Sequence, residues 1–253
     1  MLLGAGALAG LMNSIAGGGT IVTFPALIVS GLSSIAANAT STIALLPGIV
    51  SSVFGYRRNI PAVHRWLRLF APVSLAGGLA GGILLVRTPS ALFDWLVPFL
   101  ILFATLLFMT NSMFSRIFRP GGEESPRPSR RWLAGAMGFQ LCVAVYGGYF
   151  GAGIGILMLA SLGLLGFRDV HEMNTVKTIL AFLINVVAAV YFVFSGIVDW
   201  PSAGVMAVGT VAGGYSGAHF AQKLQQKSVR RLITMIGLVL SALMFYRQFI
   251  AGR

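Results

Sequence analysis

The chain has 253 residues, of which 57% are hydrophobic and 9% are charged, and its formal net charge is +12. Soluble domains use roughly 45 to 50% apolar and about 25% charged residues, so this composition excludes an ordinary soluble domain and predicts a polytopic helical membrane protein. The basic residues sit in short segments between apolar runs, which is typical of membrane loops and not of a nucleic-acid-binding face.

Apolar runs between breakers predict ten helical segments, divided into two sets. Many runs reach the ~20 residues that a helix needs to cross the hydrocarbon core. The first two segments of each set are shorter and meet at glycines, so they are expected either as re-entrant hairpins or as tilted crossings. The fold class is therefore all-α, with eight to ten membrane segments. The first set lies near 2–16, 20–31, 37–56, 69–86 and 92–115, and the second near 132–149, 153–166, 174–195, 201–221 and 229–249.

The two sets resemble each other at an offset of 134 to 136 residues. Gly17 and Gly19 match Gly151 and Gly153 at the smaller offset, as the subtraction 151 − 17 = 134 shows. Asn38 matches Asn174, and Ala76-Gly77-Gly78 matches Ala212-Gly213-Gly214, at the larger offset of 136. This correspondence predicts an internal duplication.

The charges between corresponding helices change places in the two sets. After the third helix the first set has Arg57, Arg58, Arg65 and Arg68, while the second has Asp199; after the fourth, Arg87 and Asp94 stand against Lys223, Lys227, Arg230 and Arg231. Because cytoplasmic loops collect Lys and Arg, the two halves are expected upside down relative to each other, as in secondary transporters. We expect a first repeat at 1–115, a cytoplasmic linker at 116–131, an inverted repeat at 132–253, and cytoplasmic loops at 57–68 and 223–231.

Lys177 is the charged residue placed well inside a predicted span, where a cation costs ~3 kcal/mol on insertion scales. Two interpretations stay open: it reaches the cytoplasmic surface beside Asp169 and Glu172, or it coordinates an anion. Helix starts rich in hydrogen-bond donors attract anions, although the same residue types also serve as ordinary N-caps. The predicted substrate-binding residues are Asn38, Thr40, Ser41, Asn174, Lys177 and Thr178.

The glycine clusters are predicted to bend the broken helices and to bring their backbone close to a small ligand. Close packing of small residues between helices is the alternative. The glycines concerned are Gly17, Gly18, Gly19, Gly151 and Gly153.

The remaining candidates for metal or cofactor chemistry do not form a site. His64, His171 and His219 lack metal-ligand spacing, and Cys142 is the single cysteine, so no metal and no cofactor are expected. The embedded polar residues Asn13, Gln140 and Asn185 are expected to form interhelical hydrogen bonds. The lack of an embedded carboxylate argues against a proton relay or a sodium site built on Asp or Glu, and the coupling ion, proton or sodium, stays open.

Several motifs resemble one known family. The run from Gly10 to Gly19, then Phe24-Pro25-Ala26-Leu27 and Ala37-Asn38-Ala39-Thr40-Ser41, look like the TauE/SafE family of sulfite exporter-like proteins, and Gly147 to Gly155 with Asn174 to Thr178 resemble its second repeat. The resemblance implies a multi-pass permease of the cell inner membrane that moves small anions. Family members are associated with sulfite, sulfoacetate and other organosulfur compounds. The second cluster departs from the pattern, with Ala152 where the first has Gly18.

These observations together predict a transporter and not an enzyme. Two inverted halves would move a small anion, sulfite or an organosulfonate such as sulfoacetate, by alternating access around a midplane site. A passive anion channel and a transporter of another small oxyanion are the alternatives, and an intramembrane enzyme would need a catalytic constellation that the embedded residues do not show. The expected partners are the anion and the lipid bilayer, with no nucleic acid; a homodimer is left open.

Overall fold

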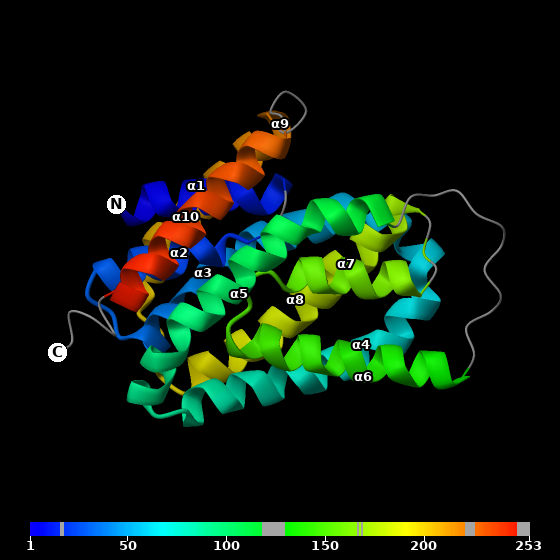
Figure 1. Ribbon diagram of the computed structural model, residues 1–253, viewed down its shortest axis with the longest axis horizontal. Coiled ribbons are helices and arrows are strands. Elements are labelled where there is room, and N and C mark those ends of the chain that lie inside the picture. Colours follow the sequence, from blue (N-terminus) through cyan, green and yellow to red (C-terminus); the bar gives the residue numbers. More distant parts are fainter. Residues whose placement is uncertain (16–17, 118–129, 166, 168, 221–225, 247–253) are drawn as a thin grey trace.

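The structure is a computed structural model that describes residues 1–15, 18–117, 130–165, 167, 169–220 and 226–246 (Figure 1). In this part of the chain every regular element is a helix, which confirms the all-α class. Gly17 and most of the 116–131 linker lie outside the described residues. The elements are α1 (Leu2–Ile15), α2 (Thr20–Val29), α3 (Ser34–Tyr56), the 3₁₀ turn η1 (Arg57–Asn59), α4 (Ile60–Arg87), α5 (Ser90–Ile117), α6 (Arg130–Tyr149), α7 (Ile154–Leu164), α8 (Val170–Phe194), α9 (Trp200–Phe220) and α10 (Gln226–Tyr246).

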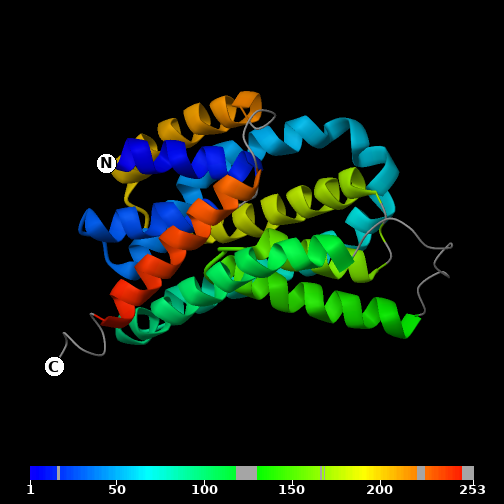
Figure 2. The same ribbon diagram turned by 45° about the horizontal axis from the view of Figure 1, so that its top comes forward.

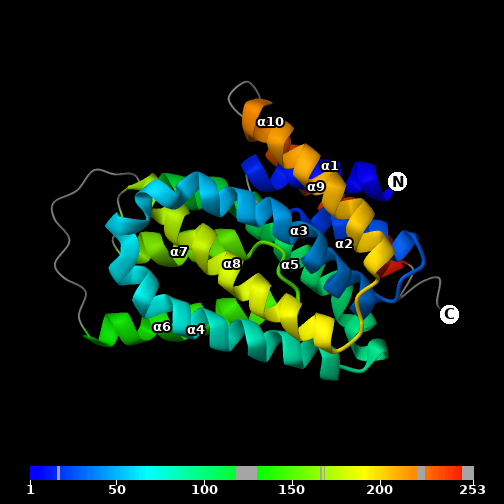
Figure 3. The same ribbon diagram turned by 180° about the vertical axis from the view of Figure 1, so that it is seen from behind.

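Three described helical stretches are long and apolar enough to cross a membrane: Ser34–Arg87, Ser90–Leu107 and His171–Phe194. The first of them, 54 residues long, contains α3, η1 and α4, which turn at η1 and so form two separate passes (Figure 3). Large apolar side chains are exposed along the outside of the bundle, among them Val205, Val208 and Val211 on α9. A surface of this kind suits contact with lipid, as expected of a multi-pass membrane protein.

The prediction that residues 57–68 form a loop is wrong, because residues 57–87 are helical throughout. Pro61 lies in the first turn of α4, where its fixed φ favours a helix and its missing N–H costs nothing. The basic residues of this segment therefore lie on η1 and the first turns of α4. Figure 1 shows that this end of the molecule is also where α5 ends and α6 begins.

Two helices begin one turn earlier than the sequence suggested. Ser33 caps α3, its Oγ accepting from the Ala36 N–H at 3.4 Å, and Asp169 caps α8, its Oδ1 accepting from the His171 N–H at 2.7 Å. Asn38 and Asn174 therefore lie beyond the first turn. The expectation that they mark helix starts, and the alternative that they are N-caps, are both wrong because Ser33 and Asp169 take that role.

The helices pair across the two halves in a way that matches an inverted duplication. The first helix of each half packs most extensively on the fourth helix of the other, α1 on α9 (Figure 2) and α6 on α4 (Figure 3), and α3 packs on α8. Within each half the second helix packs on the third, α2 on α3 and α7 on α8. Each exchanged pair has an equivalent partner pair, as a pseudo-two-fold relation requires.

Glycines make the two exchanged crossings close. On α1 and α9, a Cβ at Gly10 would meet the Thr210 carbonyl oxygen, and one at Gly213 would meet the Ala7 carbonyl oxygen. On α4 and α6, a Cβ at Gly81 would meet the Val145 carbonyl oxygen. Both crossings run parallel, since contacts advance along the two helices in the same direction. The Ala-Gly-Gly motifs of the sequence thus serve close helix packing.

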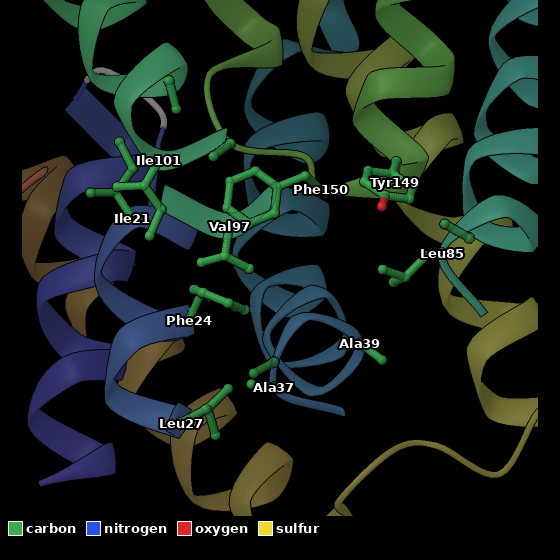
Figure 4. Close-up of a cluster of buried hydrophobic side chains, with 14 of the residues drawn as sticks. Ile21, Phe24, Leu27, Ala37, Ala39, Leu85, Val97, Ile101, Tyr149 and Phe150 are labelled. Atoms are coloured by element: carbon green, nitrogen blue, oxygen red, sulfur yellow. The ribbon is translucent and has the colours of Figure 1, made fainter. Parts of the chain in front are cut away.

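An aromatic core lies where α2, α5 and the α6–α7 junction meet (Figure 4). Phe24 and Phe150 form an edge-to-face pair with centroids 5.5 Å apart, and Phe93 pairs with Tyr149 in the same way at 5.5 Å. Phe24 and Phe150 belong to the two different halves, so this core joins the halves close to both glycine clusters.

Candidate substrate-binding cavity

Glycines with positive φ lie just before each of the two short helices. Gly18, Gly151 and Gly153 have φ angles of 92°, 80° and 79°, a left-handed conformation that residues with a Cβ adopt only at a cost. After these turns come α2 and α7, of 10 and 11 residues. Gly18, Gly151 and Gly153 therefore turn the backbone at the two equivalent junctions, α1–α2 and α6–α7.

A cavity of about 110 Å³ lies where the two junctions meet. Because a single water occupies about one probe sphere, ≳ 10–15 Å³ on this measure, the cavity has room for several waters or one small anion. Its wall is contributed by both halves of the chain. The lining residues are Asn13, Gly18, Thr20, Leu45, Ile49, Ser52, Gly151, Gly153, Ile154, Gly155, Ile156, Leu159, Lys177, Thr178, Ala181 and Asn185.

Lys177 is the one Lys, Arg, Asp or Glu among these lining residues. Its Nζ donates a hydrogen bond to Asn174 Oδ1, one turn earlier on α8, at 3.0 Å. Its stem crosses the start of α7: a Cβ added at Gly155 would lie 3.3 Å from Lys177 Cδ. The absence of a side chain at Gly155 thus leaves the space in which the lysine lies, and the side chain faces the cavity.

The N-termini of α2 and α7 also face the cavity, through Gly18 and Thr20 in one case and Gly153, Ile154 and Gly155 in the other. A helix start has N–H groups without intrahelical acceptors and the positive end of the helix dipole, so it attracts anions. Gly153 is the N-cap of α7 and offers no side chain to its first-turn N–H groups. At the other junction Asn13 Oδ1 accepts from the Gly19 N–H at 3.0 Å and fixes the turn into α2.

Several residues predicted for the site lie at this cavity. The cavity is lined by Lys177, Thr178, Gly18, Gly151 and Gly153. Asn174 accepts from the Lys177 ammonium, and Gly19, the N-cap of α2, donates to the lining Asn13. The helix starts that face the cavity are those of the short helices α2 and α7, whereas the sequence had suggested those of α3 and α8.

Three other predicted residues do not line the cavity. Asn38 Nδ2 donates to the Tyr149 carbonyl oxygen at 2.9 Å, Thr40 Oγ1 accepts from the Asp199 N–H at 3.0 Å, and the hydroxyls of Ser41 and Thr23 share a hydrogen bond of 2.5 Å. All three side chains are buried. In the structure they connect α3 to α6, to the segment before α9 and to α2.

Four polar lining residues were not among the predicted site residues: Asn13, Thr20, Ser52 and Asn185. Asn13 and Asn185 are embedded polar residues for which the sequence predicts interhelical hydrogen bonds. The bond of Asn185 is instead within its own helix, where Nδ2 donates to the Ala181 carbonyl oxygen at 2.8 Å. The signal that could have found them is their polarity within an apolar span, because such residues usually face a bundle interior or a cavity.

A family model described as sulfite exporter TauE/SafE matches residues 2–244, almost the whole chain and all of the cavity-lining residues. The chain belongs to the TauE/SafE family. It is therefore a multi-pass membrane protein of a transporter family, as the resemblance implied.

Relatives in three bacteria are similar over nearly their full length. The chain is 28% identical over 241 residues to the "Probable membrane transporter protein YfcA" of Escherichia coli, covering 94% of this chain and 86% of that protein. It is 26% identical over 244 residues to a "Probable membrane transporter protein" of Haemophilus influenzae, covering 96% and 92%. It is 27% identical over 235 residues to the "Probable membrane transporter protein ORF9" of Sinorhizobium sp, covering 92% and 87%. No solved structure matches the chain.

Proposed function

We propose that this TauE/SafE protein transports a small oxyanion, sulfite or an organosulfonate such as sulfoacetate, and binds it in the cavity at Lys177. One observation carries the proposal: a single cationic side chain lines a cavity on which two helix N-termini converge. Burying an ammonium in a bilayer costs free energy unless an anion compensates its charge. This cost favours a functional role for Lys177 over a structural one.

The donors around the cavity suit an oxyanion. The Lys177 ammonium has three N–H donors, and one of them is used by Asn174. The others, together with the Thr178 hydroxyl and the Asn185 amide, can bind sulfite or sulfonate oxygens by charge-assisted and neutral hydrogen bonds. The dipoles of α2 and α7 add to the favourable field.

The proposed transport mechanism is alternating access between two halves, 1–115 and 132–253, in the cell inner membrane. In this proposal the closely packed pairs α1–α9 and α4–α6 each move as a unit, because their glycine contacts hold a helix of one half against a helix of the other. In this proposal the linker 116–131, the basic segment 57–68 and residues 223–231 face the cytoplasm, following the positive-inside rule.

The proposal is tested by anion-dependent thermal stabilisation of the detergent-purified protein. A ligand that binds the folded state raises its apparent stability by mass action. We expect sulfite or sulfoacetate, but not chloride at equal ionic strength, to raise the Tm of the wild type and to leave that of Lys177→Met unchanged. Arg87→Gln removes an exposed charge at the end of α4 and is the matched control, which should respond like the wild type. An equal response of wild type and Lys177→Met would overturn the assignment of the site.

A further inference from the structure

The duplication lets the surroundings of Lys177 be compared with the equivalent place in the first half. At the offset of 136 residues, 177 − 136 = 41 and 174 − 136 = 38, so the pair Asn174 and Lys177 corresponds to Asn38 and Ser41. In the second half the Asn174 side-chain oxygen accepts from the Lys177 ammonium. In the first half a serine stands where the second has the cation.

The side-chain oxygen of Asn38 is buried and lacks a donor. The amide orientation is fixed, because Asn38 Nδ2 donates to the Tyr149 carbonyl oxygen at 2.9 Å and a flipped amide would set two oxygens against each other. Asn38 is 1% exposed, and its Oδ1 accepts no hydrogen bond from any described residue. Buried polar atoms are normally satisfied, so this oxygen points to a ligand.

Ser41 supplies a second acceptor on the same face of α3, one turn after Asn38. The Thr23 hydroxyl donates to the Gly19 carbonyl oxygen at 3.2 Å, so in the hydrogen bond between Thr23 and Ser41 the serine is the donor. Its proton is thereby committed and its oxygen keeps its lone pairs. Ser41 and Thr23 are both fully buried. Both hydroxyl protons of this group are thus committed, and the Asn38 side-chain oxygen and the two hydroxyl oxygens remain as acceptors.

We propose that Asn38, Ser41 and Thr23 form a binding site for a small monovalent cation, sodium, which takes the role that the Lys177 ammonium has in the second half. The ligands are neutral oxygens, which suit a hard monovalent ion, whereas protein sites for divalent ions are built with carboxylates. The site lies next to the anion cavity, since Gly19, which accepts from Thr23, follows the cavity-lining Gly18. A cation here would attract the anion, so the cation would serve as the coupling ion; this last step rests on the proposed function.

Sodium binding is tested in the absence of any oxyanion substrate, so that its outcome is independent of the anion site. The Tm of the purified protein is measured in NaCl, KCl and choline chloride at constant ionic strength. We expect sodium alone to raise the Tm of the wild type by about 3 to 6 °C at ten times its Kd. Asn38→Ala should lose this response, while Lys177→Met, altered only in the anion cavity, should keep it. Ser161→Ala is the matched control, because Ser161 is a buried serine bonded within α7.

A second variant keeps the test decisive if Asn38→Ala fails to fold. The Ser41→Lys substitution gives the first half the arrangement of the second, with an ammonium one turn from Asn38. Because this ammonium would take the place of sodium, the sodium response should disappear. A sodium response equal to that of choline in the wild type, or one retained by either site variant, would show that the site holds only water and would overturn the proposal. If sodium raises the Tm of the wild type but no oxyanion does, the result would instead count against the proposed function alone.

Discussion

Gly155 provides a test that separates anion binding from folding. A Cβ at this position would lie 3.3 Å from Lys177 Cδ and 3.8 Å from its Cγ, close enough that the flexible lysine stem must shift by a few tenths of an ångström. The Gly155→Ala substitution should therefore move the lysine side chain and weaken its bond with Asn174 without touching rigid backbone. Since alanine is the better helix former by up to about 1 kcal/mol, the folded protein should be as stable as the wild type or slightly more so.

The Gly155→Ala substitution is expected to weaken the binding of the anion. A hydrogen bond to a charged group contributes about 1.5 to 3 kcal/mol. We expect the displaced ammonium to lose roughly half of this contribution to anion binding, at either end of the range. That loss corresponds to an increase in the anion Kd of about 3- to 12-fold, since 1.4 kcal/mol is tenfold. The assay is titration of sulfite or sulfoacetate by thermal shift in detergent.

The matched control for this experiment is Gly204→Ala on α9, where a Cβ would meet nothing within 4 Å. It brings the same change in helix propensity and should leave the anion Kd unchanged. If Gly155→Ala binds the anion as tightly as Gly204→Ala does, the lysine stem does not control the affinity and the reasoning fails.

Three further predictions concern stability. Gly81→Ala should lower the free energy of unfolding by about 1 to 3 kcal/mol by overpacking against the Val145 carbonyl oxygen, whereas Gly82→Ala, whose Cβ would lie 3.4 Å from Ala188 Cα, should cost much less; equal Tm values would contradict the close α4–α6 crossing. Gly153→Ala should cost about 1 to 2 kcal/mol, because its φ of 79° places alanine in the left-handed region; an unchanged denaturation midpoint would show that the turn before α7 is different. Hydrogen bonds from the Ser202 side chain and backbone N–H hold the pKa of the Asp199 carboxyl below its ordinary value of 3.8. The capping of α9 by Asp199 should therefore stabilise the protein fully above pH 3.8, and this stabilisation should be lost as the pH falls through the lowered pKa. The Asp199→Ala variant should have a lower Tm at pH 7 and a flatter dependence of Tm on acid pH.

Much of the fold could be predicted from the sequence, because apolar runs and breakers determine where helices lie in a membrane protein. Helix ends were less accurate where capping decided them. Pro61 and Asp169 start α4 and α8 earlier than the apolar runs do, because a first turn tolerates polar residues that the hydrophobic pattern does not count.

The site was predicted in part, for a physical reason. Lys177 and the glycine clusters stand out in the sequence, since a charge inside a span and a broken helix are both rare there. Asn38 and Ser41 have the same residue types as the cavity-lining Asn185 and Ser52, and the difference lies in which helix face meets the cavity. That depends on how α3 is rotated against α2 and α6, which sequence spacing alone does not determine.

The most direct test of the central claim is counterflow of radiolabelled sulfite and sulfoacetate in proteoliposomes containing the purified protein. The account predicts that one of these anions enters faster when the same unlabelled anion is present inside, as alternating access requires, and that Lys177→Met abolishes this uptake while Arg87→Gln preserves it. Flux that is indifferent to the internal anion would indicate a channel. Uptake by Lys177→Met at the wild-type rate would contradict the assignment of the anion site to the cavity between α2 and α7.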